Sequence, residues 1–131
     1  MEEPIWVLLE AARAIQSRQV AEHGGIVGVR DDSLLESAMA RPRNLWADGD
    51  PAPDLAALAA AYAYGLARNH PFHDGNKRVA LVVCRLFLLS NGLDLAASQE
   101  EKFRTFLALA AGDVDEPTLG AWIRGRLANR P

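Results

Sequence analysis

Two histidines, an aspartate, a glycine, an asparagine, a lysine and an arginine stand within nine consecutive residues, HPFHDGNKR, at positions 70–78. The segments on either side are rich in alanine, leucine and valine, so this concentration of polar groups is local. Transfer of a phosphoryl or nucleotidyl group to a hydroxyl needs donors for anionic oxygens, a divalent cation, and a group that deprotonates the acceptor. The nine residues contain candidates for all three and therefore predict a phosphate-handling active site.

Gly75 and Asn76 stand where a loop ends and an apolar helix is expected to begin. The free N–H groups and partial positive charge of a helix N-terminus favour phosphate, and glycine lets a phosphate approach the backbone. Asn76 can donate an amide hydrogen bond to a phosphate oxygen. Lys77 and Arg78 oppose the helix dipole in the first turn, a misfit that makes sense if an anion sits among them. We therefore expect residues 75–78 to bind phosphate.

Asp74 offers a hard oxygen ligand directly before this segment, and one carboxylate together with substrate phosphates is a usual way of holding Mg²⁺. His70 can accept a proton near neutral pH and is the candidate general base. Phe72 is expected to bury its ring and fix the loop. Taken singly, His70 fits a structural or surface histidine and Asp74-Gly75 fits a turn. Their joint occurrence favours the catalytic interpretation.

Helices separated by short turns account for the sequence, and strand signals are scarce. The expected helices cover residues 5–23, 33–40, 54–69, 76–90, 100–112 and 117–129. The second ends before Pro42, which leaves residues 42–53 as the longest irregular stretch. The fourth is apolar almost all round, the mark of a helix buried at the centre. The prediction is an all-α fold, a compact single-domain bundle of about six helices around a buried central helix, over residues 1–131.

Composition narrows the class of protein further. A chain of 131 residues suffices for one domain, and its net charge of −3 argues against a surface that coats nucleic acid. The acidic N-terminus is unlike a signal peptide, and the longest apolar stretch, interrupted by Arg85, falls short of the ~20 residues that span a bilayer. We therefore expect a cytoplasmic protein without a membrane segment. Cys84 lies in an apolar run and fits a buried small hydrophobe.

Residues 70–78 resemble the signature of the Fic/Doc superfamily, H-x-F-x-[D/E]-G-N-[G/K]-R, and fill every named position. The segments GVRDDSLLESAMARP and AYAYGLARNHPF resemble the Doc branch, the "death on curing" toxins, and the resemblance covers roughly residues 20–95. Members that transfer AMP carry a glycine at the position of Lys77 and a second arginine at the position of Leu81. This chain, with Lys77 and Leu81 at these positions, shares both departures from the AMP-transferring members with the Doc branch.

The resemblance implies the toxin of a type II toxin–antitoxin system, a protein kinase that transfers the γ-phosphate of ATP to a threonine of a translation factor. In the Doc branch this target is elongation factor Tu, and translation stops. His70 would be the general base, Asp74 would hold Mg²⁺, and Gly75, Asn76, Lys77 and Arg78 would cradle the phosphates. The implied partner is a cognate antitoxin whose helix-forming tail docks in a groove, with no direct nucleic-acid contact. Residues 41–50 are assigned as a flap over the target segment.

Three alternatives stay open on the sequence. The nearest is a Fic-type adenylyltransferase, which would transfer AMP to a protein hydroxyl. A second is an HD-type metal phosphohydrolase, for which the chain offers His23, the pair His73-Asp74, and Asp113 or Asp115. That scheme has no role for the GNKR segment that follows. The third is a binding module without chemistry, against which the intact signature speaks.

Overall fold

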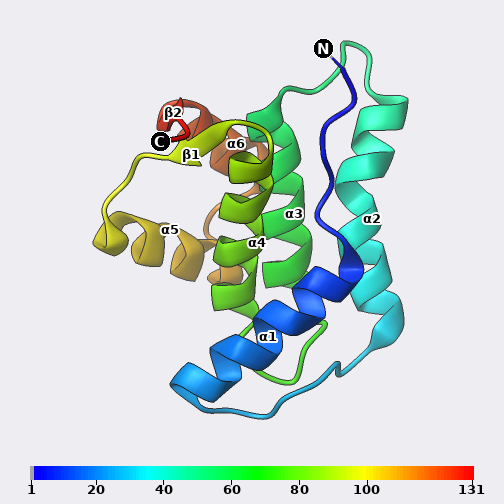
Figure 1. Cartoon of the computed structure of the whole chain (residues 1–131), viewed down its shortest axis with the longest axis vertical. Coiled ribbons are helices and arrows are strands. Elements are labelled where there is room, and N and C mark those ends of the chain that lie inside the picture. The colour runs from blue at the N-terminus through cyan, green and yellow to red at the C-terminus, as the bar shows by residue number, and fades with distance from the viewer. Residues whose placement is uncertain (1) are drawn as a thin grey trace.

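The computed structural model describes residues 2–131, and in this range the chain forms six helices and two short strands (Figure 1). The helices are α1 (Leu9–His23), α2 (Asp32–Asp48), α3 (Leu55–Asn69), α4 (Asn76–Ser90), α5 (Gln99–Ala111) and α6 (Glu116–Arg124). The strands β1 (Leu93–Leu95) and β2 (Leu127–Asn129) pair antiparallel. The all-α prediction is therefore confirmed, although residues 127–129, expected at the end of the last helix, form β2.

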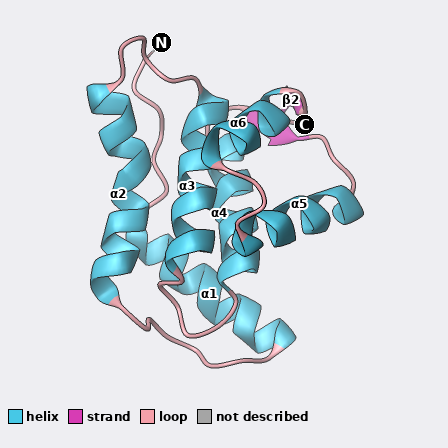
Figure 2. Ribbon diagram, turned by 180° about the vertical axis from the view of Figure 1, so that it is seen from behind, coloured by secondary structure: helices cyan, strands magenta, loops and turns pink. Residues whose placement is uncertain are grey.

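Helix α3 is the buried centre of this arrangement. It packs against α2, α4, α5 and α6, and Figure 2 shows it between α2 on one side and α5 and α6 on the other. Ten of its 15 residues are buried, and most of these are alanines. Small side chains allow neighbouring helices to approach closely. At Gly65 the approach is so close that an added Cβ would lie 3.1 Å from the Cα of Ala38 in α2.

Helix α4 is not the central helix, so the prediction that placed it there is wrong. Only seven of its 15 residues are buried, and the helix packs against α3, α1, β1 and α5. Arg85 is exposed and its Nε bonds Oδ1 of Asp94 in β1 at 2.9 Å. Leu81 is only half-buried because it packs against the core and also lines a cavity. Apolar composition alone does not distinguish a side chain in the core from one that faces a cavity.

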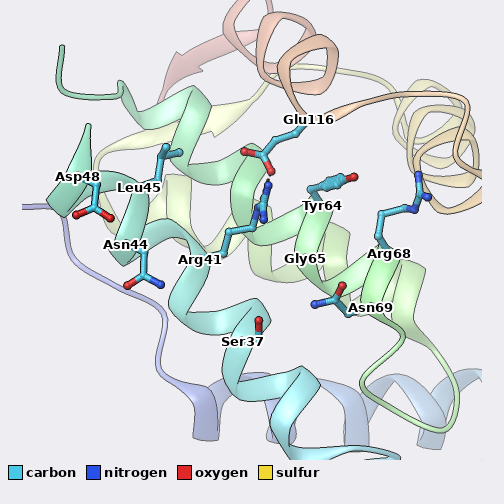
Figure 3. A pocket seen from close by; sticks show the side chains of 10 residues that line it. All are labelled: Ser37, Arg41, Asn44, Leu45, Asp48, Tyr64, Gly65, Arg68, Asn69 and Glu116. Carbon is cyan, nitrogen blue, oxygen red and sulfur yellow. Dashed lines mark hydrogen bonds and ion pairs between the residues drawn. The ribbon is translucent and has the colours of Figure 1, made fainter. Parts of the chain in front are cut away.

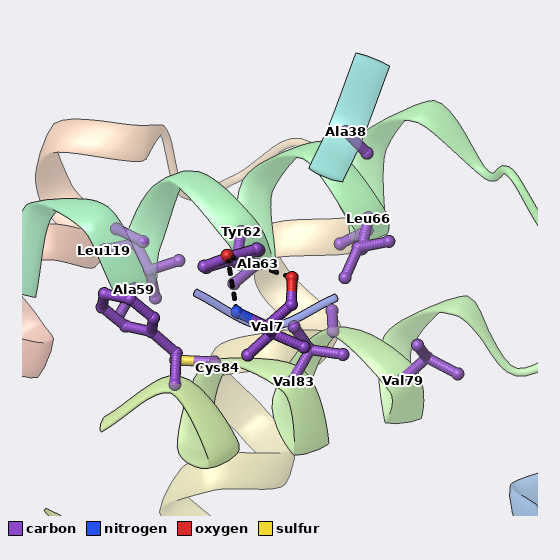
Figure 4. Close-up of a cluster of buried hydrophobic side chains, with 14 of the residues drawn as sticks. Val7, Ala38, Ala59, Tyr62, Ala63, Leu66, Val79, Val83, Cys84 and Leu119 are labelled. Carbon is purple, nitrogen blue, oxygen red and sulfur yellow. Dashed lines mark hydrogen bonds between the residues drawn. The ribbon is translucent and has the colours of Figure 1, made fainter. Parts of the chain in front are cut away.

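The chain before α1 is extended, whereas the sequence predicted a helix from Ile5. Two side chains bind this segment's backbone, one from α3 and one from the residue that follows α4. The N–H of buried Val7 donates to the Tyr62 hydroxyl at 3.0 Å (Figure 4). The side chain of Asn91 accepts from the N–H of Ile5 at 2.8 Å and donates to its carbonyl at 2.9 Å. These bonds satisfy backbone groups of a segment that forms no helix of its own.

Helix α2 continues through Pro42 to its end at Asp48, so the expected break at Pro42 is wrong. Proline removes one backbone N–H and crowds the carbonyl four residues earlier, that of Ala38. In this helix the cost is outweighed by packing, because the proline belongs to the face that α2 buries. The buried residues of that face are Leu35, Ala38, Met39 and Pro42.

Short-range interactions define the starts of three helices. The carboxylate of Asp31 caps α2 by accepting from the N–H of Leu34 at 3.1 Å. Ser98 and Glu101 form a capping box at the start of α5. Pro117 lies in the first turn of α6.

Cys84 lies within the hydrophobic core that α3 and α4 share (Figure 4). Its side chain is fully buried, and burial raises the pKa of the thiol to about 12. The thiol therefore stays protonated at neutral pH and acts as a small hydrophobe, as expected. Over residues 2–131, no helix combines the length and apolar content needed to cross a lipid bilayer.

Asp54 links the start of α3 to α6 and gives a prediction about stability. Its carboxylate accepts from the N–H of Ala57 at 2.8 Å and from Arg124 at 2.6 and 3.0 Å. The Arg124 hydrogen bond, and then the cap, hold the pKa of Asp54 below its ordinary value. A lowered folded-state pKa contributes stability that is present above the unfolded-state pKa and lost as the pH falls through the folded-state value.

Asp54→Ala should therefore lower the free energy of unfolding at pH 7 by about 1–2 kcal/mol. The difference from the wild type should shrink below about pH 4, where the wild-type carboxylate also becomes protonated. Urea unfolding at pH 7 and pH 3 measures both effects. Asp113→Ala, which removes an exposed carboxylate, is the control and should change little. A loss of equal size at both pH values would contradict this account.

Candidate active site

The residues predicted to do chemistry line one cavity of about 660 Å³. It lies where the loop between α3 and α4, residues 70–75 (the motif loop), meets the start of α4 and the side of α5. Its polar end is formed by His70, Asp74, Gly75, Asn76, Lys77 and Arg78. Its apolar wall is formed by Leu81, Phe103, Phe106, Leu107, Ala110 and Ala111. Such a cavity suits a ligand with an anionic part and a flat apolar part.

Asn76 holds the motif loop in its shape. Its side-chain oxygen accepts from the N–H of Phe72 at 3.0 Å, and its side-chain nitrogen donates to the Phe72 carbonyl at 3.1 Å. Phe72 is 1% exposed, so the expectation that its ring anchors the loop is confirmed. The loop uses one of the two N–H donors of this amide, so the side-chain bond from Asn76 to phosphate stays a prediction. The backbone N–H of Asn76 lies in the first turn of α4, where a helix leaves such groups without an internal partner.

The start of α4 is open toward the cavity. Gly75 is the N-cap residue, with φ of 79°, and it provides no side-chain hydrogen bond to the first turn. Lys77 and Arg78 follow and are exposed. In residues 2–131 neither forms an ion pair with a carboxylate. The helix end therefore offers free N–H groups and two cationic side chains to an anion in the cavity.

His70 ends α3 in the left-handed conformation, with φ of 50° and ψ of 55°. Its backbone is held by Arg30, whose Nε donates to the His70 carbonyl at 2.8 Å and whose guanidinium also bonds the Asn69 carbonyl at 3.1 Å. These bonds satisfy carbonyls that the end of a helix leaves free. The side chain of His70 is left exposed at the cavity. Sequence reasoning missed Arg30 because the contact joins residues 40 positions apart.

Asp74 is fixed by the loop that follows α1. Its Oδ2 accepts from the N–H of Ile26 at 2.6 Å. Gly25, with φ of +113°, lies so close that an added Cβ would be 2.8 Å from the Cβ of Asp74. Within residues 2–131 no basic side chain forms an ion pair with the carboxylate of Asp74, which lines the cavity. A single charged carboxylate beside an anion site fits Mg²⁺ bound jointly by protein and phosphate oxygens.

The candidate residues of the phosphohydrolase alternative do not come together as a metal site in the described part of the chain. In the part of the chain that the structure describes, no three histidine, cysteine, aspartate or glutamate side chains come together to hold a metal ion. Asp115 instead caps α6, where it accepts from the N–H of Thr118 at 2.9 Å. His23 and His73, two of the candidates for that scheme, are exposed.

Residues 41–50, assigned as a flap over the target segment, do not line the cavity at His70. Residues 41–48 are the last turns of α2 and contribute to a second cavity, of about 470 Å³, between α2 and α3 (Figure 3). There Arg41 bonds Glu116 at 2.6 Å, and its guanidinium lies over the ring of Tyr64. The segment that contacts the motif loop is residues 24–31, whose Gly28 carbonyl accepts from the N–H of His73 at 3.1 Å.

Asn76→Ala tests the structural role of the buried amide. The substitution leaves the N–H and carbonyl of buried Phe72 without their partner, which should lower the free energy of unfolding by about 2–3 kcal/mol. Asn76→Asp keeps an acceptor for the N–H and should lose less. Chemical denaturation of the wild type, Asn76→Asp and Asn76→Ala should rank their free energies of unfolding in that order, with the wild type highest. If Asn76→Ala unfolds at the wild-type denaturant concentration, the amide does not hold the loop.

Comparison with known proteins agrees with the signature at this cavity. A sequence model of the Fic/DOC family matches residues 6–88. Toxin Doc of Mycolicibacterium smegmatis is 47% identical over 74 residues, which cover 56% of this chain and 57% of that protein. Protein kinase doc of Escherichia phage P1 is 30% identical over 111 residues, which cover 85% of this chain and 86% of that protein. The match thus spans little more than half the length of the first relative. With the family signature lining one cavity of a helical fold, the chain belongs to the Fic/DOC family.

Proposed function

We propose that this protein is the toxin of a type II toxin–antitoxin system and acts as a Doc-like protein kinase in the cytoplasm. It transfers the γ-phosphate of ATP to a threonine of a translation factor, elongation factor Tu by resemblance, and thereby inhibits translation. The observation that carries the proposal is the single cavity shared by His70, Asp74 and the cationic start of α4. The names of the two relatives, Toxin Doc and Protein kinase doc, support it.

ATP is proposed to bind with its phosphates at the start of α4 and its base on the apolar wall. The backbone N–H groups of the first turn, together with Lys77 and Arg78, bind phosphate oxygens. Phe103 and Leu107 of α5 offer the base a flat apolar surface in the same cavity. The polar and apolar ends of the cavity thus correspond to the two ends of the nucleotide.

His70 takes the proton of the acceptor hydroxyl, whose oxygen then attacks the γ-phosphorus. The bond from the γ-phosphorus to the bridging oxygen breaks, and ADP leaves. Asp74 would hold Mg²⁺, which when bound neutralises charge on the phosphates. Lys77 and Arg78 oppose the charge that collects on the leaving diphosphate. Arg30 keeps the backbone of His70 in place while the imidazole ring of His70 receives the proton.

Transfer of the γ-phosphate is favoured over transfer of AMP by two cavity residues. Lys77 and Leu81 stand one helical turn apart and both line the cavity. Lys77 puts bulk and charge where AMP-transferring members carry glycine. Leu81 is apolar where those members place a second phosphate-binding arginine. The nucleotide is therefore proposed to bind in the opposite sense, with its γ-phosphate toward the acceptor.

Incubation with ATP labelled on the γ-phosphate, Mg²⁺ and purified elongation factor Tu should label that factor. His70→Ala should reduce the rate by about 100-fold or more, because general base catalysis is lost. The matched control is His73→Ala, which removes an exposed histidine outside the cavity and should keep the wild-type rate.

A parallel reaction with ATP labelled on the α-phosphate separates the alternatives. Label from the α-phosphate on the factor would identify an adenylyltransferase and overturn the kinase proposal. If neither label is transferred, and expression of His70→Ala arrests growth as the wild type does, the protein acts by binding alone.

The antitoxin tail is proposed to dock on α5 at the edge of this cavity. Phe103 is 65% exposed and Leu107 is 43% exposed, and their spacing of four residues puts them on one helix face. An amphipathic helix binds such a row of apolar side chains in a groove. A tail in this position would cover the opening through which ATP enters, which explains neutralisation by occlusion.

Phe103→Ser should weaken binding of the cognate antitoxin's tail by about 10-fold or more, because it removes a central apolar anchor. Isothermal titration calorimetry with the tail peptide measures the change. Ile5→Ser is the matched control, since Ile5 is similarly exposed at 62% but lies outside the cavity. If the two variants bind the peptide equally well, the tail docks elsewhere.

A further inference from the structure

Gln16 of α1 is a buried polar residue whose three hydrogen bonds all go to loops at the active-site cavity. It is 1% exposed. Its side-chain nitrogen donates to the carbonyls of Ile26 and Asp74, each at 3.1 Å, and its side-chain oxygen accepts from the N–H of Gly28 at 3.0 Å. The amide therefore joins residues 24–28 (the glycine loop) to the motif loop.

The bond to Ile26 continues to the carboxylate of Asp74. While the carbonyl of Ile26 is bound by Gln16, its N–H donates to Oδ2 of Asp74 at 2.6 Å. Asp74 is thus held twice, at its main-chain carbonyl by Gln16 directly and at its carboxylate through Ile26. Gly25 lies close to the same carboxylate, because a Cβ added to Gly25 would be 3.1 Å from Oδ2 of Asp74.

We propose that Gln16 is a positioning residue that aims the Asp74 carboxylate into the cavity and so sets the affinity of the site for Mg²⁺ bound to a nucleotide. This inference rests on the proposed function, in which Asp74 is the ligand of Mg²⁺. Gln16 does not line the cavity and acts only through Ile26 and the Asp74 backbone.

The chemistry of these partners explains why an amide suits this position. An amide and backbone N–H groups orient a carboxylate without neutralising it, so the charge of Asp74 stays available to a cation. A lysine or arginine in the same place would form an ion pair with Asp74 and compete with Mg²⁺. Groups that orient a metal ligand typically change metal affinity by about 10–100-fold when they are removed.

The test uses Gln16→Met, which keeps the length of the side chain and removes its hydrogen bonds. Calorimetry with a non-hydrolysable ATP analogue measures binding with Mg²⁺ and with EDTA. We expect about 10-fold weaker binding in Mg²⁺ and less than a twofold change in EDTA. Tyr62→Phe is the control, because it also removes a buried hydrogen bond, the one between Tyr62 in α3 and Val7, but neither residue lines the cavity. It should leave both affinities within about twofold of the wild-type values.

Equal weakening in Mg²⁺ and in EDTA would show that Gln16 acts only on the fold and would overturn the inference, as would unchanged binding in both. Hydrogen exchange at the Ile26 amide gives a second readout that needs no ligand. We expect it to speed up about 10-fold or more in Gln16→Met and to stay at the wild-type rate in Tyr62→Phe. An unchanged Ile26 rate in Gln16→Met would also overturn the inference.

The two proposals fail in different ways. If Asp74→Asn binds the analogue as the wild type does in Mg²⁺, the assignment of Asp74 to Mg²⁺ is wrong and the proposed function loses its metal ligand. Faster Ile26 exchange in Gln16→Met would in that case still show that Gln16 positions the carboxylate. If Asp74→Asn loses the Mg²⁺ effect and Gln16→Met does not, only the positioning inference fails.

Discussion

Buried amides must find hydrogen-bond partners, and in this protein Gln16 and Asn76 find theirs in the loops that surround the cavity of the family signature. If either loop moved away, a buried amide would lose partners at a cost of about 1–3 kcal/mol for each group left unpaired. The bonds that stabilise the fold are therefore the bonds that fix the cavity. Asp74 and Phe72 are held by the core of the molecule although they belong to a loop.

The alanines of α3 make this arrangement possible. Because α3 presents small side chains and Gly65, α2 approaches it closely, and α4 packs along another side. The end of α3 and the start of α4 are joined by only six residues, 70–75, so the packing of the two helices sets the span of the motif loop. His70 at one end of that loop and Lys77 just beyond the other consequently face one cavity.

Features that depend on neighbouring residues were predictable from the sequence, and features that depend on distant ones were not. The caps of the helices, the anchoring of Phe72 and the position of the signature at the start of α4 follow from local chemistry. The course of α2 through Pro42 and the extended chain around Val7 depend on packing against α3, which no local pattern reports. Gln16 and Arg30 were missed for the same reason, since Gln16 bonds Asp74 58 positions away and Arg30 bonds His70 40 positions away.

The start of α4 differs from the other helix starts in a way that favours an anion. Side chains cap four of the other described helices, with Asp31, Asp54, Ser98 and Asp115 as the capping residues. Helix α1 has no such cap, but Glu10 lies in its first turn. Helix α4 has neither, and carries Lys77 and Arg78 where the dipole disfavours cations. A missing cap costs about 1 kcal/mol, and a bound phosphate would supply both the acceptor and the negative charge. The sequence thus leaves open, at one helix end, the position that a ligand's phosphate can fill.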